Sequence, residues 1–142
     1  LEVIKAMGRL QSHMTQNPVS FCQEAAVAAL NDNSGAVEKM RVEFEKRGKH
    51  MAERLNAIEG LVCPEPTGAF YCFPDVTAYF GRNIRGNSIE NSTDFAKALL
   101  EDAKVALVPG DPFGCPKNVR LSFACSVEQI DKGIDRIAEW LK

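Results

Sequence analysis

The sequence lacks the features that mark several large classes of protein. Its 142 residues carry a formal net charge of −2, and acidic and basic side chains are interspersed along the chain. No apolar run approaches the roughly 18 residues that a membrane helix needs, and the first residues lack the basic start and apolar core of a signal peptide. No basic face or polybasic segment is present. We therefore expect neither nucleic acid nor membrane as a partner.

The five cysteines show no pattern of a structural or redox site. They are odd in number, widely spaced and without a C-x-x-C pair, which argues against zinc binding and redox work. A chain of this length can bury an apolar core without disulfides. We expect the cysteines to be reduced, small core residues of a cytoplasmic protein. They are Cys22, Cys63, Cys72, Cys115 and Cys125.

Other common catalytic motifs are also missing. No G-x-G-x-x-G and no phosphate loop ending in Lys-Ser or Lys-Thr is present, so nucleotide binding is unsupported. His13 and His50 lie in polar helical surroundings, away from any cluster with metal spacing and from any Ser/Asp arrangement suited to nucleophilic catalysis. We predict no metal site, and we interpret both histidines as structural or solvent-facing.

The first part of the chain has helical patterns. Residues 1–30 contain two helical pieces with a break around Asn17-Pro18, and residues 31–35 have the composition of a turn. From residue 36 to about 59, apolar side chains recur at helical spacing among Glu, Lys and Arg. This pattern predicts a long amphipathic helix.

Short strands and two further helices follow. The apolar runs 61–63, 68–73 and 105–108 and the stretch around Arg120 are typical of strands, and residues 68–73, apolar on both faces, should be central in their sheet. Residues 79–91 look like a surface loop. Ser92 can cap one helix, and Ser126-Val127-Glu128-Gln129 matches a capping box that opens the last one.

This order predicts the fold class. Strands grouped in pairs and separated by helices favour an α+β fold. We expect a small, mainly antiparallel sheet of three to four strands with helices packed on it, reached through the long amphipathic helix.

Arg120 is the most informative residue. Its neighbours Val119, Leu121 and Phe123 alternate like the apolar face of a half-buried strand, which places Arg120 on the opposite face. A guanidinium is always charged and its planar fork of donors matches a carboxylate, so this position suits an acid substrate. An arginine pointing into water from an edge strand fits the same alternation, because charged residues are mostly exposed.

Two neighbouring segments are candidates for binding. Residues 108–114 hold glycines and prolines between two strands, which should build a fixed loop around Gly110 that presents Phe113, and such loops often carry function. A tight connection with Phe113 in the core is equally compatible. In residues 65–71, Gly68 and Ala69 leave room beside the strand for another backbone or a ligand, or serve structure alone.

Four motifs together resemble a known family. They are Gly68–Asp75, Asp94–Glu101, Val105–Gly114 and Val119–Ala124. In their order and spacing they resemble the C-terminal part of a class I aminotransferase, with the closest likeness to bacterial-type aspartate aminotransferases. The resemblance extends over nearly all of the chain. Two departures, Pro112 for alanine and Cys125 for threonine, affect the expected loop geometry more than the identification.

The resemblance implies a function. Such enzymes transfer an amino group between an amino acid, here most closely aspartate, and 2-oxoglutarate, and they use pyridoxal phosphate as homodimers. Residues 1–35 would be a helical remnant of the large cofactor domain and residues 36–142 the small C-terminal domain. Arg120 would bind the substrate α-carboxylate. Gly110 and Phe113, in the loop near the substrate entrance, would also contact the substrate.

The resemblance also implies an incomplete site. The family's Schiff-base lysine stands in a Ser-Lys segment upstream of Leu1, and the cofactor's other main ligands would be absent too. We therefore expect no catalytic and no cofactor-binding residue in this chain, and no transamination by the chain alone. The alternative is a non-catalytic α+β module that binds a small carboxylate or regulates a partner.

Overall fold

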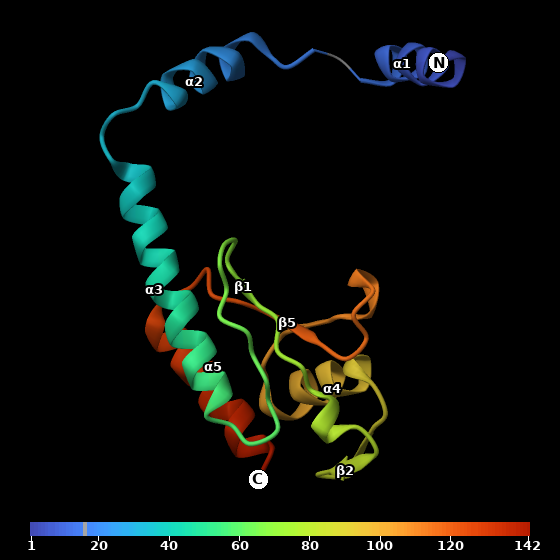
Figure 1. Ribbon diagram of the computed structural model, residues 1–142, viewed down its shortest axis with the longest axis vertical. Helices are drawn as coiled ribbons and strands as arrows, with labels where there is room; N and C mark the ends of the chain where they lie inside the picture. The colour runs from blue at the N-terminus through green and yellow to red at the C-terminus, as the bar shows by residue number, and fades with distance from the viewer. Residues whose placement is uncertain (16) are drawn as a thin grey trace. The chain divides into compact units, whose positions relative to one another are not determined.

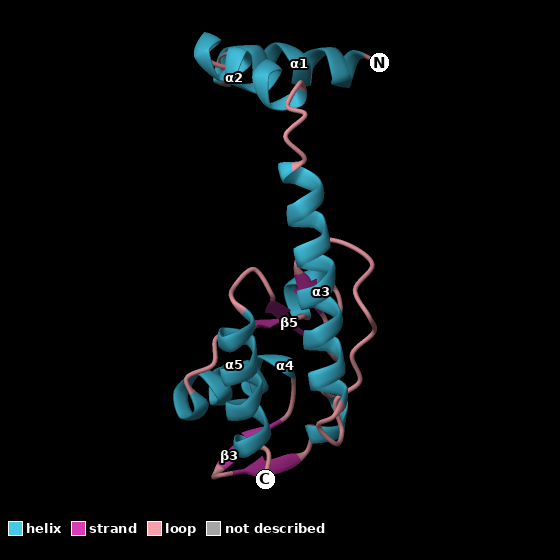
Figure 2. Ribbon diagram, turned by 90° about the vertical axis from the view of Figure 1, so that its left-hand side faces the viewer, coloured by secondary structure: helices cyan, strands magenta, loops and turns pink. Residues whose placement is uncertain are grey.

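The computed structural model describes residues 1–15 and 17–142. It divides the chain into two units, Leu1–Ala36 and Val37–Lys142. None of the described helices is long and apolar enough to cross a membrane. The elements of both units are shown in Figure 1 and, coloured by type, in Figure 2.

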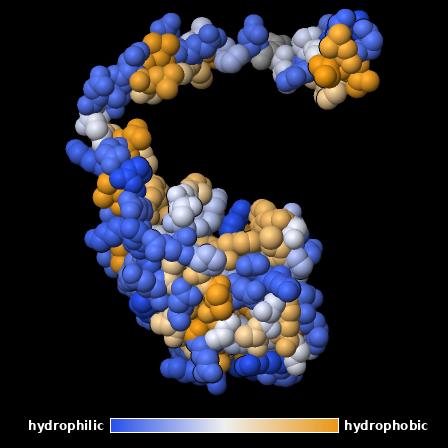
Figure 3. All heavy atoms as spheres, viewed as in Figure 1, coloured by the Kyte–Doolittle hydropathy of each residue, from blue (hydrophilic) through white to orange (hydrophobic). Residues whose placement is uncertain are grey.

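The first unit consists of two helices, α1 (Glu2–Met14) and α2 (Ser20–Leu30). Both confirm the helical pattern of residues 1–30. Neither helix contains a buried residue, and their apolar side chains are visible at the surface in Figure 3. The two helices therefore carry exposed apolar side chains, and the described residues of the first unit form no buried core of their own.

The second unit begins with the long helix α3 (Ala36–Asn56). It confirms the predicted amphipathic helix, although it ends three residues before the expected end at 59. Its buried Gly48 permits a close approach, because a Cβ there would lie 2.9 Å from Pro66 Cγ and 3.0 Å from Phe123 Cζ. A larger residue at 48 would force these neighbouring side chains or α3 to move.

The sheet is small, antiparallel and three-stranded. Its strands are β1 (Tyr71–Cys72), β4 (Val108–Pro109) and β5 (Val119–Ser122), in the order β1-β5-β4. The fold class is thus the predicted α+β. Val62 adds an isolated antiparallel bridge to Asp75 in place of the expected strand 61–63.

The prediction that residues 68–73 form a central strand was wrong. Only Tyr71 and Cys72 pair, and they lie at the edge of the sheet, while β5 is central. The aromatic residues of this segment contact other rings instead of filling both sides of a central strand. The ring centroids of Phe70 and Tyr71 lie 4.3 Å apart, and those of Phe73 and Phe113 lie 6.3 Å apart. Aromatic contacts outside the core imitated the pattern of a strand buried on both faces.

The expected surface loop at 79–91 contains a second, two-stranded hairpin. Strands β2 (Arg82–Ile84) and β3 (Asn87–Ile89) pair across Arg85 and Gly86. Both turn residues have positive φ, 52° and 91°, which is the conformation of a tight two-residue hairpin turn. Three-residue strands are too short for an alternation of side chains to reveal them.

Two helices complete the second unit. Helix α4 (Ser92–Ala98) is capped by Asn91, whose side chain accepts from the amides of Thr93 and Asp94, rather than by Ser92 as predicted. The chain continues through a π-helical turn at Leu99–Ala103. Helix α5 (Val127–Trp140) begins after Ser126, whose hydroxyl accepts from the Gln129 amide. The predicted N-terminal cap of α5 is therefore confirmed.

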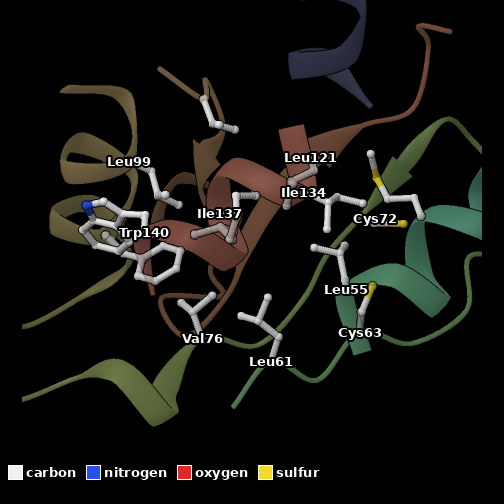
Figure 4. Packing of buried hydrophobic residues seen from close by; sticks show 14 of the residues in the cluster. Leu55, Leu61, Cys63, Cys72, Val76, Leu99, Leu121, Ile134, Ile137 and Trp140 are labelled. Carbon is white, nitrogen blue, oxygen red and sulfur yellow. The ribbon is translucent and has the colours of Figure 1, made fainter. Parts of the chain in front are cut away.

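The core lies where α3, α4 and α5 meet the inner face of β5. Figure 4 shows Ile134 and Ile137 of α5 in the middle of this core. Burying one such side chain contributes about 1.5–3 kcal/mol, so these contacts dominate the stability of the unit. Its buried members include Leu55, Phe95, Leu99, Val119, Phe123, Ile134, Ile137 and Trp140.

Candidate functional site

Arg120 lies on the outer face of the central strand. Its neighbours Val119 and Leu121 are buried, whereas Arg120 is half-buried and stands opposite Val108 of β4. The alternation predicted from the sequence is confirmed, and because β5 is central, the edge-strand alternative is not what the structure shows. A central strand holds the start of this long side chain firmly.

Two aromatic rings flank the guanidinium. Arg120 Cζ lies 4.4 Å from the centroid of the Tyr71 ring and 4.7 Å from that of Phe113. Tyr71 pairs with Ser122 and therefore lies diagonally across from Arg120 on the same face of the sheet. Contacts of this kind are attractive because the ring faces are electron-rich.

Arg120 has no charged or hydrogen-bonded partner among the residues that the structure describes. Two other arginines of the second unit are paired with acids: Arg54 donates to Asp131 at 2.6 Å, and Arg47 donates to Glu43 at 2.7 Å. A guanidinium carries five N–H donors. Those of Arg120 are held in place by packing and remain available to an external acceptor.

Gly110 shapes the loop that carries Phe113. Its amide donates to the Asn118 carbonyl at 2.8 Å, and its carbonyl accepts from the Phe113 amide at 2.9 Å. A Cβ at this position would lie only 2.2 Å from the carbonyl oxygen of Cys115. The structure therefore gives Gly110 a scaffolding role, and direct contact between Gly110 and a substrate stays a prediction.

Phe113 belongs to the short 3-10 helix η3 (Asp111–Phe113). Its side chain is 48% exposed and meets the ring of Phe73 edge-on. It is therefore not tucked into the core, which was the alternative left open by the sequence. The loop presents this ring to Arg120.

The segment 65–69 lines a separate hollow of about 490 Å³ beside α3, and Arg120 is not among its lining residues. Its charged rim is internally paired. Lys49 and Arg41 both hydrogen-bond Glu45, which lowers the pKa of that carboxyl. The space predicted beside Gly68 and Ala69 is thus present as this hollow, but the charged side chains at its rim already pair with one another.

The described residues hold no cluster of three or more His, Cys, Asp or Glu side chains that could bind a metal ion. His50 lies 2.7 Å from Asp131 of α5, which is a structural contact, and His13 is exposed on α1. Both histidines have the structural or solvent-facing positions predicted from the sequence.

The five cysteines are free thiols in the structure. The prediction of core positions was wrong for Cys22 and Cys115, which are exposed because α2 buries no residue and Cys115 lies in the loop before β5. Cys63 and Cys72 are buried together, and a hydrogen bond from the Cys72 thiol lowers the pKa of Cys63. The same contact, together with burial, raises the pKa of Cys72. The Cys72 thiol does not face the Arg120 site, because Cys72 lies on the opposite face of β1 from Tyr71.

Comparison with known proteins identifies the family. The family model for class I and II aminotransferases matches residues 1–137. This chain belongs to that family. An aspartate aminotransferase from Streptomyces avermitilis is 44% identical over 140 residues, which cover 99% of this chain and 34% of that protein.

Solved structures agree with this assignment. The crystal structure of the aspartate aminotransferase from Rhizobium meliloti matches with a TM-score of 0.88 at 40% identity, covering 99% of this chain and 35% of the other. An alanine aminotransferase from Pyrococcus furiosus matches with a TM-score of 0.82 at 27% identity, covering 99% and 34%. The chain thus spans about a third of the length of the aminotransferases it matches.

The family implies pyridoxal phosphate in its full-length members, and the residues of this chain do not fit the cofactor's Schiff base. A lysine that forms a Schiff base is commonly desolvated or placed beside another cation, which lowers its pKa. All nine lysines of this chain are exposed. Among the described residues, no lysine therefore has the desolvated setting that favours such a bond.

Proposed function

We propose that this chain is the C-terminal part of an aminotransferase and that Arg120 binds the α-carboxylate of the amino acid and of the 2-oxo acid. The observation that carries the proposal is the half-buried guanidinium of Arg120, flanked by two rings and without an acidic partner among the described residues. Membership of the aminotransferase family supports it. A carboxylate is the natural partner of such a planar fork.

The role of Arg120 is to position the substrate. Two parallel N–H···O bonds fix both the location and the orientation of a carboxylate. The bond between the α-carbon and its hydrogen is then held in one direction, and such positioning can supply a large part of a rate enhancement. In the complete enzyme, pyridoxal phosphate would supply the chemistry at that carbon.

We propose aspartate and 2-oxoglutarate as the substrates. The names of the bacterial relatives support aspartate, and the alanine aminotransferase among the similar structures has the same need to hold an α-carboxylate. Arg120 recognises what these substrates share, so the choice between them depends on residues outside the Arg120 site. We further propose that the complete enzyme is a cytoplasmic homodimer.

The two units correspond, in this proposal, to the two domains of the complete enzyme. Residues 1–35 would be the end of the large cofactor domain and residues 36–142 the small domain. The absence of buried residues in α1 and α2 supports this assignment, because their apolar side chains need cover from elsewhere. The Schiff-base lysine would lie in a Ser-Lys segment encoded upstream of Leu1, and the present chain would be inactive alone.

The binding role can be tested on this chain by NMR. Titration with 2-oxoglutarate should shift the Nε–H resonance of Arg120, because the carboxylate would accept from the guanidinium. Arg120→Lys keeps the charge but removes the fork, and it should weaken binding at least several-fold. The matched control is Arg82→Lys, which changes another arginine placed over a tyrosine ring and should leave binding unchanged.

Two results would contradict the binding role. One is the absence of any shift at Arg120 at saturating 2-oxoglutarate, and the other is equal binding by the Arg120→Lys and unmodified chains. A separate assay addresses inactivity: the pure chain, verified by intact mass, should not transaminate aspartate when pyridoxal phosphate is added. Turnover that is lost on Arg120→Ala would refute that part of the proposal.

A further inference from the structure

The guanidinium of Arg120 is held from two sides by parts of the chain that are distant in sequence. Tyr71 comes from β1 and Phe113 from the loop after β4, and these are the two neighbours of β5 in the sheet. The rings therefore approach Arg120 from the two sides of its own strand. Packing, rather than a hydrogen bond, determines where this side chain lies.

Two other contacts between arginines and rings in the second unit differ from this one. Arg82 lies over one ring at 5.5 Å, and Arg47 lies over one ring at 6.0 Å and also donates to Glu43 and to the Cys125 carbonyl. Among the described residues, Arg120 alone combines two close rings with no polar partner. Its surroundings orient the charge without neutralising it.

Of the two rings, that of Tyr71 is the more firmly placed. Its backbone pairs with Ser122 of the central strand, its side chain is half-buried, and its ring lies against that of Phe70 at 4.3 Å. Phe113 is more exposed and comes from a loop. Of the two rings, that of Tyr71 is therefore the better-fixed packing surface for the guanidinium of Arg120.

We propose that Tyr71 is a positioning residue that orients Arg120 so that a carboxylate meets the N–H edge of the guanidinium in its plane. This inference rests on the proposed function of Arg120. With rings beside the guanidinium, water and side chains have less access to its faces, and its edge remains the open direction. The ring, and not the hydroxyl, performs this role, because the structure records no hydrogen bond from the Tyr71 hydroxyl among the described residues.

The experiment compares the unmodified chain with Tyr71→Leu and Tyr71→Phe. In the free chains, Tyr71→Leu should shift the Arg120 Nε–H resonance, because the ring current of Tyr71 is lost. It should also speed rotation about the Nε–Cζ bond of Arg120, because the packing of the ring against the guanidinium is lost. It should also weaken 2-oxoglutarate binding about five- to tenfold, which lies within the range of a cation–π contact. Tyr71→Phe, the matched control, keeps the ring and should retain both the affinity and the slow rotation.

Different results overturn different claims. Unchanged affinity and rotation in Tyr71→Leu would refute the positioning role, and a loss in Tyr71→Phe as large as in Tyr71→Leu would assign the role to the hydroxyl. If the unmodified chain binds no 2-oxoglutarate, the proposed function fails, while the rotation rates in the free chains still decide whether Tyr71 holds Arg120.

A second measurement, on the unmodified chain, covers the case in which Tyr71→Leu does not fold. Fluorescence of the buried Trp140 will show whether Tyr71→Leu is folded. If it is not, cross-relaxation between the Tyr71 ring protons and the Arg120 δ protons in the unmodified chain takes its place. Strong cross-relaxation supports the proposed contact, and its absence would refute the proposal.

Discussion

Helices α1 and α5 have similar sequence patterns and opposite environments. Ile4, Met7 and Leu10 form an apolar stripe on α1, yet these side chains are 69%, 64% and 61% exposed. The isoleucines at 130, 134 and 137 form such a stripe on α5, and each is 2% exposed. An amphipathic pattern identifies the face that needs cover, whereas burial requires a partner such as the sheet that α5 packs against.

Replacing one buried ring should show the largest difference in mutational effect between the second unit and α1. Phe123 is buried against Phe44 and Gly48, so Phe123→Ala should lower the free energy of unfolding by about 3–5 kcal/mol. Leu10→Ala, in the exposed stripe of α1, should change it by less than about 0.5 kcal/mol. Urea unfolding followed by the fluorescence of Trp140, the only tryptophan, measures both. A large effect of Leu10→Ala would show that α1 supports the core.

Adding one methyl group to a glycine gives the second test. Gly110→Ala places a Cβ against backbone oxygens of Cys115 and Asn118, and it should destabilise the second unit by about 2–3 kcal/mol. Gly8 of α1 has nothing within 4 Å of a Cβ, so Gly8→Ala should stabilise that helix by about 1 kcal/mol. Urea unfolding and helical circular dichroism measure the two effects. If Gly110→Ala has wild-type stability, the backbone approach at this loop is not as close as described.

Removing one charge should have the smallest effect. Asp131 of α5 accepts from Arg54 at 2.6 Å and lies 2.7 Å from His50 Nε2, which links α5 to α3. Asp131→Asn should cost about 1 kcal/mol at neutral pH, because the three side chains are partly exposed. Glu2→Gln in α1 removes an exposed pair with Lys5 and should have no measurable effect. Equal effects of the two changes on urea unfolding would mean that the link between α3 and α5 adds nothing.

Much of the fold was predictable where short-range patterns decide it. The helices α1, α3 and α5 follow from their spacing of apolar residues, and α2 follows from its alanine-rich sequence. The cap at Ser126 follows from a four-residue motif. The face occupied by Arg120 follows from the two-residue period of a strand. The position of β1 at the sheet edge and the hairpin around Arg85 were missed, because aromatic contacts and short strands hide the patterns on which such predictions depend.

The candidate site was predictable in part. Arg120 and the loop with Phe113 stood out by residue type and setting, but Tyr71 did not. The contact between Tyr71 and Arg120 depends on the register that pairs Tyr71 with Ser122, and nothing in the local sequence around Tyr71 reveals that register. Similarly, the need for glycine at 110 comes from the carbonyl oxygens of Cys115 and Asn118 rather than from an unusual backbone angle.

The sequence by itself determined which segments become helices, which strand face carries the charge and which family the motifs resemble. These properties depend on residues a few positions apart, whose relative directions follow from backbone geometry. Only the tertiary structure decided that β5 is central, that Tyr71 and Phe113 flank Arg120, and that α5 is buried while α1 is exposed. These properties depend on contacts between distant segments, which chain folding creates and local spacing does not encode.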